Sequence, residues 1–289
     1  MKLDGRRESS NVDDRRGQRM SGGMMGGLGI GGIIIAAILA WFTGGNPLEV
    51  LQNVDMTAVT QQGSAEEYKP TAEEEALAHF SKQILASTED VWNEEFRKMG
   101  RTYEAPTLVL FSGQVQSGCG GATSSSGPFY CSADQCVYID LSFFSNMKKT
   151  LGAGGDFAYA YVIAHEVGHH VQYLLGTLGR AHQQMSQLSQ KESNQISVRL
   201  ELQADFYAGV WAHHENKMFK SLEDGDIEEA INTAAVIGDD YLQKKAQGYT
   251  VPESFNHGTS AQRSKWLKRG FTTGSMEVGD TFTPAYSAL

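Results

Sequence analysis

The stretch His165-Glu166-Val167-Gly168-His169 constrains the fold of this chain more than any other feature. Histidines four residues apart lie on one face of a helix, so both imidazoles can bind the same metal ion. Glu166 lies at the edge of that face, where it can take a proton from a metal-bound water without binding the metal itself. Apolar residues at helical spacing on both sides favour a buried helix over about residues 156–175, and they argue against a chance match.

A downstream acidic pattern supplies a third protein ligand. Catalytic zinc sites usually have three protein ligands and an open position for water, so two histidines are one short. Glu201 and Asp205 are four residues apart among apolar neighbours, and on a helix they share a face. The alternative is a solvated acidic face, but a carboxylate pair in apolar surroundings needs a cation. We expect Glu201 to bind one Zn²⁺ together with the two histidines. Asp205 is then placed to accept the free ring N–H of a histidine ligand.

Together these patterns resemble the Glu-zincin metallopeptidases and, more narrowly, the putative neutral zinc metallopeptidase family of bacterial envelope proteins. The matching stretches run nearly end to end: 5–9 (GRRES), 11–16 (NVDDRR), 127–131 (GPFYC), 137–144 (VYIDLSFF), 164–172 (AHEVGHHVQ), 199–205 (RLELQAD) and 257–263 (HGTSAQR). The resemblance implies a single-pass membrane anchor and a zinc-dependent, peptidase-like domain of zincin-like fold. One position departs from the family pattern, Cys136, where a non-cysteine is expected.

An uncharged apolar segment near the N-terminus indicates attachment to a membrane. Residues 28–42 (LGIGGIIIAAILAWF) are densely apolar, and residues 24–45 reach the roughly 20 residues of a spanning helix. A cleaved signal peptide is the alternative, but the preceding region is long and partly acidic, and no good A-x-A cleavage site follows. We therefore predict a cytoplasmic tail (1–23), a transmembrane helix (24–45), a juxtamembrane linker (46–70) and a zinc metallopeptidase domain (71–289).

The charge distribution predicts the orientation of that anchor. Six basic residues precede the apolar segment: Lys2, Arg6, Arg7, Arg15, Arg16 and Arg19. No Lys or Arg follows until Lys69, so the positive-inside rule puts the N-terminus in the cytoplasm of the inner membrane and the domain in the periplasm. The rest of the chain holds 18 basic and 30 acidic residues, and this acidic balance argues against nucleic-acid binding.

The cysteines agree with an oxidising compartment. Cys119 and Cys131 flank a Gly/Ser-rich loop, and a disulfide between them would restrict that loop. Cys136 is left over, or competes with Cys131 for Cys119. A zinc site made of these cysteines is disfavoured, because the chain has no Cys-x-x-Cys pair and three thiols are one short.

The periodicity of the remaining chain predicts an α+β fold with a small sheet and the zinc between two helices. Capping boxes start predicted helices at Thr71 (with Glu74) and at Thr259 (with Gln262). The predicted helices cover residues 71–99, 156–175, 193–219, 227–246 (capped by Asp226) and a short stretch from 259. The predicted strands cover residues 107–111 and 136–141. The strand–loop–strand unit between 107 and 141 either offers an edge to an extended peptide or is a simple meander under the helices.

The transition state of peptide hydrolysis also needs a donor for its oxyanion. His257, just before a predicted helix, is the leading candidate; Tyr159, Tyr161 and Tyr207 are others. His170 is 100° round the helix from His169 and is expected to face away from the metal. The sequence thus supports a membrane-anchored zinc endopeptidase acting on protein or peptide. The alternative is a non-catalytic zinc-binding envelope factor that acts by protein binding or assembly, although such a protein would not need Glu166.

Overall fold

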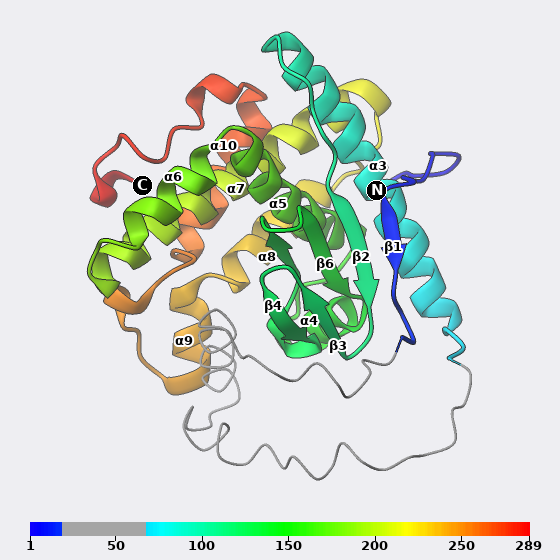
Figure 1. Cartoon of the computed structure of the whole chain (residues 1–289), viewed down its shortest axis with the longest axis horizontal. Helices are drawn as coiled ribbons and strands as arrows, with labels where there is room; N and C mark the ends of the chain where they lie inside the picture. Colours follow the sequence, from blue (N-terminus) through cyan, green and yellow to red (C-terminus); the bar gives the residue numbers. More distant parts are fainter. Residues whose placement is uncertain (19–67) are drawn as a thin grey trace.

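A four-stranded sheet and the helices packed against it form the body of the protein (Figure 1). This computed structural model describes residues 1–18 and 68–289. The strand order is β1 (Val12–Asp14), β2 (Thr107–Phe111), β6 (Cys136–Asp140) and β5 (Phe129–Cys131). The pairs β1–β2 and β2–β6 are parallel, and β5 is antiparallel to β6. Among the described residues, β5 and β1 are therefore the two edges of this sheet.

The two faces of the sheet bury different apolar clusters. In β2, Leu108 and Leu110 pack into the large core shared with the helices, whereas Val109 and Phe111 pack into a second, smaller cluster. The second cluster also contains apolar residues of the antiparallel hairpin formed by β3 (Gln114–Ser117) and β4 (Gly120–Thr123). Because side chains alternate along a strand, the hairpin covers the face opposite the helices. Burial on both faces explains why the β2 sequence is continuously apolar after Thr107.

Several helices begin at capping motifs that can be recognised in the sequence. They are α3 (Ala72–Lys98), α4 (Ser142–Leu151), α5 (Asp156–Leu174), α6 (Thr177–Met185), α7 (Gln190–Phe219), α8 (Asp226–Val236), α9 (Asp239–Gln247) and α10 (Ser260–Thr273). Short 3₁₀ turns are η2 (Ser124–Ser126), η3 (Pro252–Ser254), η4 (Met276–Val278) and η5 (Tyr286–Ala288). Both predicted capping boxes are present, at Thr71 and at Thr259, and a third opens α7 at Ser189.

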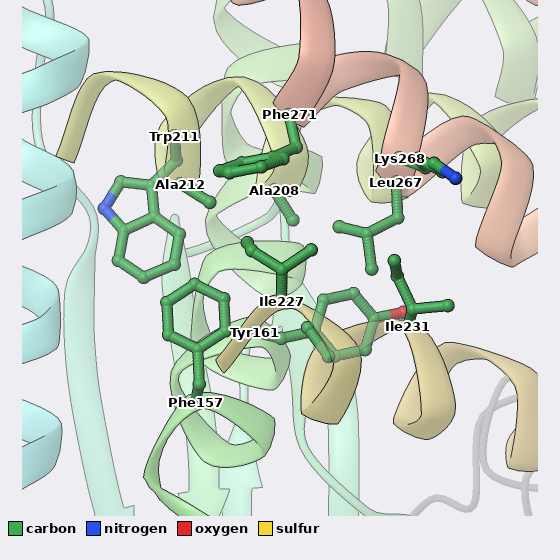
Figure 2. A pocket seen from close by; sticks show the side chains of 11 residues that line it. Phe157, Tyr161, Ala208, Trp211, Ala212, Ile227, Ile231, Leu267, Lys268 and Phe271 are labelled. Carbon is green, nitrogen blue, oxygen red and sulfur yellow. The ribbon is translucent and has the colours of Figure 1, made fainter. Parts of the chain in front are cut away.

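A small cavity between α5, α7, α8 and α10 shows how closely the helical core is packed (Figure 2). Phe157 and Trp211 line it with their rings stacked 5.8 Å apart, opposite Ile227 and Leu267. Its volume is about 10 Å³ and its walls are almost entirely apolar, so it has neither the room nor the polar partners to hold a ligand. The candidate functional residues lie elsewhere, at the contact between α5 and α7.

The N-terminal residues belong to the same folded unit as the domain. Leu3 lies in the main core, and β1 pairs with β2 in a register that sets Val12 opposite Leu108. The guanidinium of Arg6 is 2.7 Å from the carboxylate of Glu215, which is fully buried on α7. The structure thus corrects the predicted division of the chain, because residues 1–18 are part of the domain and not a separate tail.

Basic residues that the sequence analysis counted as an orientation signal have partners in this folded unit. Arg7 is 2.6 Å from Asp90 of α3, and Arg16 is 3.0 Å from Glu75 of the same helix. Both side chains are therefore held in ion pairs with α3. No helix in residues 1–18 and 68–289 is long and apolar enough to cross a bilayer. The predicted spanning segment (24–45) and most of the linker lie outside the described residues.

The α+β class is confirmed, with differences in detail. The predicted helix over 227–246 is wrong, because α8 and α9 are separate and their junction holds Gly238. A Cβ atom added to Gly238 would lie 2.4 Å from the backbone nitrogen of Ser260, so a larger residue would clash there. The N-cap of α8 is Gly225, and Asp226 is its first residue. The sequence did not predict β1, the β3–β4 hairpin, β5, α4 or α6, all of which are short, and β1 pairs with a segment far away in the chain.

Candidate metal centre

The side chains of His165, His169 and Glu201 converge between α5 and α7. The Nε2 atom of His165 is 3.2 Å from one carboxylate oxygen of Glu201, and the Nε2 atom of His169 is 3.3 Å from the other. One ligand atom from each of the three residues lies within 4.8 Å of the others. The i,i+4 spacing on α5 places the two imidazoles on one face, as the sequence predicted, and α7 supplies the carboxylate that faces them.

The outer nitrogen of each histidine has a fixed partner. The Nδ1 atom of His165 is 2.8 Å from Oδ1 of Asp205, and that of His169 is 2.9 Å from Oε1 of Gln172. A carboxylate and an amide oxygen only accept hydrogen bonds, so each Nδ1 carries a proton. A bound metal would take the lone pair of each Nε2 in the shared space. Sequence reasoning placed Asp205 in this role but missed Gln172, which lies three residues after His169 on the same helix.

Gln172 is itself held rigidly. Its amide nitrogen donates to the backbone oxygen of Leu200 at 2.7 Å and to the side chain of Gln203 at 3.2 Å. Gln203 in turn donates to the backbone oxygen of Gly279 at 3.0 Å. The orientation of His169 is therefore fixed from α7 and from the C-terminal segment. The sequence feature that could have identified Gln172 is its position three residues after His169, but this spacing is only a weak indicator for a neutral side chain.

The electrostatics show that the pocket requires positive charge. Burial alone would lower the pKa of His165, but the neighbouring carboxylates of Asp205 and Glu201 raise it to about 10. Burial alone would raise the pKa of Glu201, but the two imidazoles hold it well below its usual range. Burial alone would also raise the pKa of Asp205, but Arg263 and His165 lower it to about 2. The carboxylates stay ionised at neutral pH, so a bound cation would compete with imidazole protons for this space.

The two residues that flank these ligands on α5 have distinct environments. Glu166 follows His165 and is buried. His170 follows His169 and is fully buried away from the site, with one ring nitrogen 2.9 Å from the Tyr130 hydroxyl and the other 2.7 Å from a backbone oxygen. Burial lowers the pKa of His170 to about 4, which keeps the ring neutral. The structure thus places His170 on the opposite side of the helix, as its angular position predicts.

His257 lies beside the turn of α7 that carries Glu201. Its neighbour Gly258 packs closely against Val198 and Leu202 of that helix. The Nδ1 atom of His257 is 3.2 Å from Oδ1 of Asp239, and the other oxygen of Asp239 accepts three backbone N–H groups from residues 256–258.

These contacts fix the charge and orientation of His257. Burial opposes its charged form, but the hydrogen bond and the negative charge of Asp239 raise its pKa above the usual value. The sequence did not identify Asp239 as the partner of His257, because acidic residues are common in the first turn of a helix, where they stabilise the helix itself.

The three tyrosines that were candidates for the oxyanion donor have different environments from that of His257. Tyr161 is buried, and its hydroxyl donates to Asp205 at 2.6 Å. Tyr159 stacks on Phe144 with the ring centroids 4.6 Å apart, and Tyr207 is buried. Of the four candidates, His257 is partly exposed and has a carboxylate partner, Asp239, that favours its protonated form.

A disulfide joins Cys119 and Cys131, as predicted, and Cys136 remains a half-buried free thiol. Cys131 ends β5, the antiparallel edge strand that packs on α5 through Tyr130 and His170. The bond therefore ties the β3–β4 hairpin to the edge of the sheet next to the metal-binding helix. β5 is an edge strand of the sheet and lies beside α5.

The donor set fits a catalytic zinc ion. Two neutral imidazole nitrogens and one carboxylate are a common ligand set of hydrolytic zinc sites, and three protein ligands leave a position for water. The fixed Nδ1 partners are those that zinc-binding histidines usually have. The donors come from two long helices that pack against each other in the main core.

Comparison with known proteins agrees with this geometry. A family model described as "Putative neutral zinc metallopeptidase" matches residues 1–282. The protein named "Uncharacterized protein YpfJ" from Escherichia coli strain K12 is 49% identical over 297 residues, covering 98% of this chain and 99% of its own. "Uncharacterized protein Mb2605" from Mycobacterium bovis is 46% identical over 193 residues, covering 63% of this chain and 64% of its own. No solved structure matches.

Proposed function

Because this chain belongs to that zinc metallopeptidase family, we propose that it is a zinc-dependent endopeptidase that hydrolyses peptide bonds in proteins or peptides. The observation that carries the proposal is the convergence of the Nε2 atoms of His165 and His169 on the carboxylate of Glu201, with Glu166 next to the first histidine. A site that only bound zinc for structural reasons would be closed by a fourth protein ligand. Among the described residues, the metal-binding cluster has three members.

Glu166 is the proposed general base. Bound zinc would lower the pKa of a coordinated water to about 7 and polarise the substrate carbonyl. Glu166 would accept a proton from the attacking water and return a proton to the leaving amine. Its position directly after His165 on α5 supports this role, because that position is next to the ligand-bearing face of the helix without sharing it.

His257 is the proposed oxyanion donor. Asp239 accepts its Nδ1–H and favours its protonated form, which leaves Nε2–H free to donate to the negatively charged oxygen of the tetrahedral intermediate. The substrate is proposed to bind as an extended strand along β5, where backbone hydrogen bonds give affinity with little dependence on side chains. This arrangement favours an endopeptidase of broad sequence preference.

The test is cleavage of an unfolded protein by the full-length chain purified in detergent. Wild-type protein is expected to cleave it, and a chelator should abolish cleavage. The near-isosteric Glu166→Gln variant should keep one zinc per chain and lose cleavage, because an amide cannot accept the proton. Glu228→Gln, an exposed position on α8, is the matched control. Cleavage by Glu166→Gln at the wild-type rate refutes the mechanism. Zinc binding without cleavage by any variant would instead indicate a non-catalytic binding factor.

We further propose that the folded unit lies in the periplasm, attached to the inner membrane by the apolar segment. The Cys119–Cys131 disulfide supports an oxidising compartment. Because β1 is hydrogen-bonded to β2, residues 1–18 lie on the same side of any membrane as the domain. An apolar segment that crossed the membrane once would put residues 1–18 and the domain on opposite sides and prevent this pairing. We therefore propose that the apolar segment attaches to the inner membrane from the periplasmic side.

This topology is tested with Lys2→Cys in a Cys136→Ser background, since the Lys2 side chain is 68% exposed. In cells with an opened outer membrane, a membrane-impermeant maleimide should label the new cysteine. Protection from labelling until the inner membrane is lysed would place the N-terminus in the cytoplasm and contradict the pairing of β1 with β2.

A further inference from the structure

Arg263 forms a buried ion pair directly behind the candidate metal ligand His165. Its side chain is 3% exposed, and that of Asp205 is fully buried. The Nε atom of Arg263 donates to Oδ2 of Asp205 at 2.8 Å, and Nη2 donates to Oδ1 at 3.0 Å. The same Oδ1 atom is the partner of His165 Nδ1 at 2.8 Å. One carboxylate therefore joins a guanidinium from α10 to a histidine from α5.

Tyr161 closes this network. Its hydroxyl donates to Oδ1 of Asp205 at 2.6 Å and accepts from Nη2 of Arg263 at 3.3 Å. Oδ1 thus receives donors from three side chains, and Oδ2 receives the remaining arm of the guanidinium. A carboxylate held by a two-pronged donor cannot rotate about its terminal bond without losing charge-assisted hydrogen bonds. The direction in which Asp205 accepts from His165 is fixed by this network.

The helix packing brings Arg263 to this position. On α10, Gly270 approaches α7 so closely that an added Cβ would lie 2.0 Å from the backbone oxygen of Phe206. On α7, an added Cβ at Gly209 would lie 2.2 Å from the backbone oxygen of Leu267. Asp205 is four residues before Gly209, and Arg263 is seven residues before Gly270. These spacings keep each charged residue on the same helix face as its glycine, so the close crossing also brings the two charges together.

The charge of Arg263 also balances the site. Glu166, Glu201 and Asp205 bring three carboxylates to one buried region, and a divalent cation offsets only two of their charges. The guanidinium supplies the third positive charge, with its Nη2 atom 3.9 Å from Glu201 as well. It is itself permanently charged and cannot bind a metal, so it adds positive charge without competing for the ligand positions.

We propose that Arg263 is a positioning residue for the metal site. It orients Asp205 so that His165 keeps its proton on Nδ1 and presents Nε2 to the metal. This inference rests on the proposed zinc site. A lysine at this position would preserve the charge but not the two-pronged geometry, because an ammonium is a single point of charge on a flexible stem. Geometry and charge can therefore be separated by substitution.

The experiment measures zinc affinity of the full-length chain in detergent by competition with a chromophoric chelator. Arg263→Lys and Arg263→Met are compared with Arg269→Met, a control on the same helix whose guanidinium lies over the Trp266 ring. We expect zinc to bind about 10- to 100-fold more weakly in Arg263→Met, in the range for lost partners of metal ligands. Arg263→Lys should fall in between, and the control should match wild type. Zinc affinity within two-fold of wild type in folded Arg263 variants overturns the proposal.

Two further measurements separate positioning from general stability. The double variant Asp205→Asn/Arg263→Met removes both buried charges, so it is expected to fold even where Arg263→Met does not. Its zinc affinity should still be weakened at least ten-fold, and wild-type affinity in this variant also overturns the proposal. In ¹H–¹⁵N spectra of the zinc-bound chain, the Nδ1 proton of His165 should be protected from solvent exchange in the wild type and should exchange faster in the Arg263 variants. A wild-type chain that binds no zinc would refute the proposed function itself, which is a distinct outcome.

Discussion

Replacement of Arg6 tests whether the N-terminal segment is part of the domain. Its guanidinium lies 2.7 Å from a carboxylate oxygen of Glu215 and 3.5 Å from the centre of the Phe219 ring. Glu215 is fully buried, and its other oxygen accepts from Ser87 of α3. Arg6→Met keeps much of the volume of the side chain but leaves the Glu215 carboxylate without its cation. An uncompensated buried charge of this kind usually costs about 3–5 kcal/mol of unfolding free energy.

For a domain of this size each kcal/mol shifts the thermal midpoint by roughly 2–4 °C, so Arg6→Met should unfold roughly 6–20 °C below wild type. The measurement is thermal unfolding of the full-length chain in isolated membranes, followed by proteolysis of the unfolded fraction. Arg6→Met/Glu215→Gln should recover most of the loss, because it removes the unpaired charge. Lys2→Met is the control, since the Lys2 side chain is 68% exposed and its ion pair with Glu223 should contribute less than about 1 kcal/mol.

An unchanged midpoint for Arg6→Met would refute the reasoning. It would mean that residues 1–18 do not contact α7 in the membrane-bound protein, as expected if a bilayer separated them. A loss that Arg6→Met and Lys2→Met share equally would also count against it, because then burial of Glu215 would not be the cause.

Further substitutions test the site and the disulfide. Glu201→Ala should lose zinc under a buffered chelator, because it removes one of three ligands, and undiminished zinc would reject the assignment. Cys119→Ser should destabilise the chain by roughly 2–4 kcal/mol in denaturant melts, whereas Cys136→Ser should not; equal effects would mean that the thiols exchange roles. Burial lowers the pKa of His170 to about 4 from 6.5, so the metal-free chain should lose up to about 3 kcal/mol as pH falls from 6.5 to 4. His170→Gln should flatten that decline, and an unchanged pH profile would contradict it.

The features that the sequence predicted correctly depend on short spacings. The capping box at Thr71 needs residues three apart, and the paired imidazoles of His165 and His169 need residues four apart on one helix. Glu201 could be found because its apolar neighbours made a solvated acid implausible. In each case the physical cause lies within one helical turn, so it can be read without knowing the tertiary structure.

Two of the features that the sequence did not predict depend on contacts between distant segments. The pairing of β1 with β2 joins Val12 to Leu108, and nothing near Val12 identifies that partner. The break after α8 follows from the contact of Gly238 with Ser260, which a helical pattern cannot reveal. The N-terminal arginines were taken as an orientation signal because the positive-inside rule counts charges without knowing whether they have acidic partners.

Helix α7 links these observations, because three of its acidic residues face partners from different parts of the chain. Glu201 faces the histidines of α5, Asp205 pairs with Arg263 of α10, and Glu215 pairs with Arg6 of the N-terminal segment. A buried carboxylate needs its partner in place, so each pair ties one distant segment to α7. The terminal stretches GRRES and HGTSAQR lie far from the metal-binding helix in sequence, yet both supply an arginine to the helix that carries Glu201. Loss of either arginine should therefore weaken the same structural unit, by lower stability for Arg6 and by lower zinc affinity for Arg263.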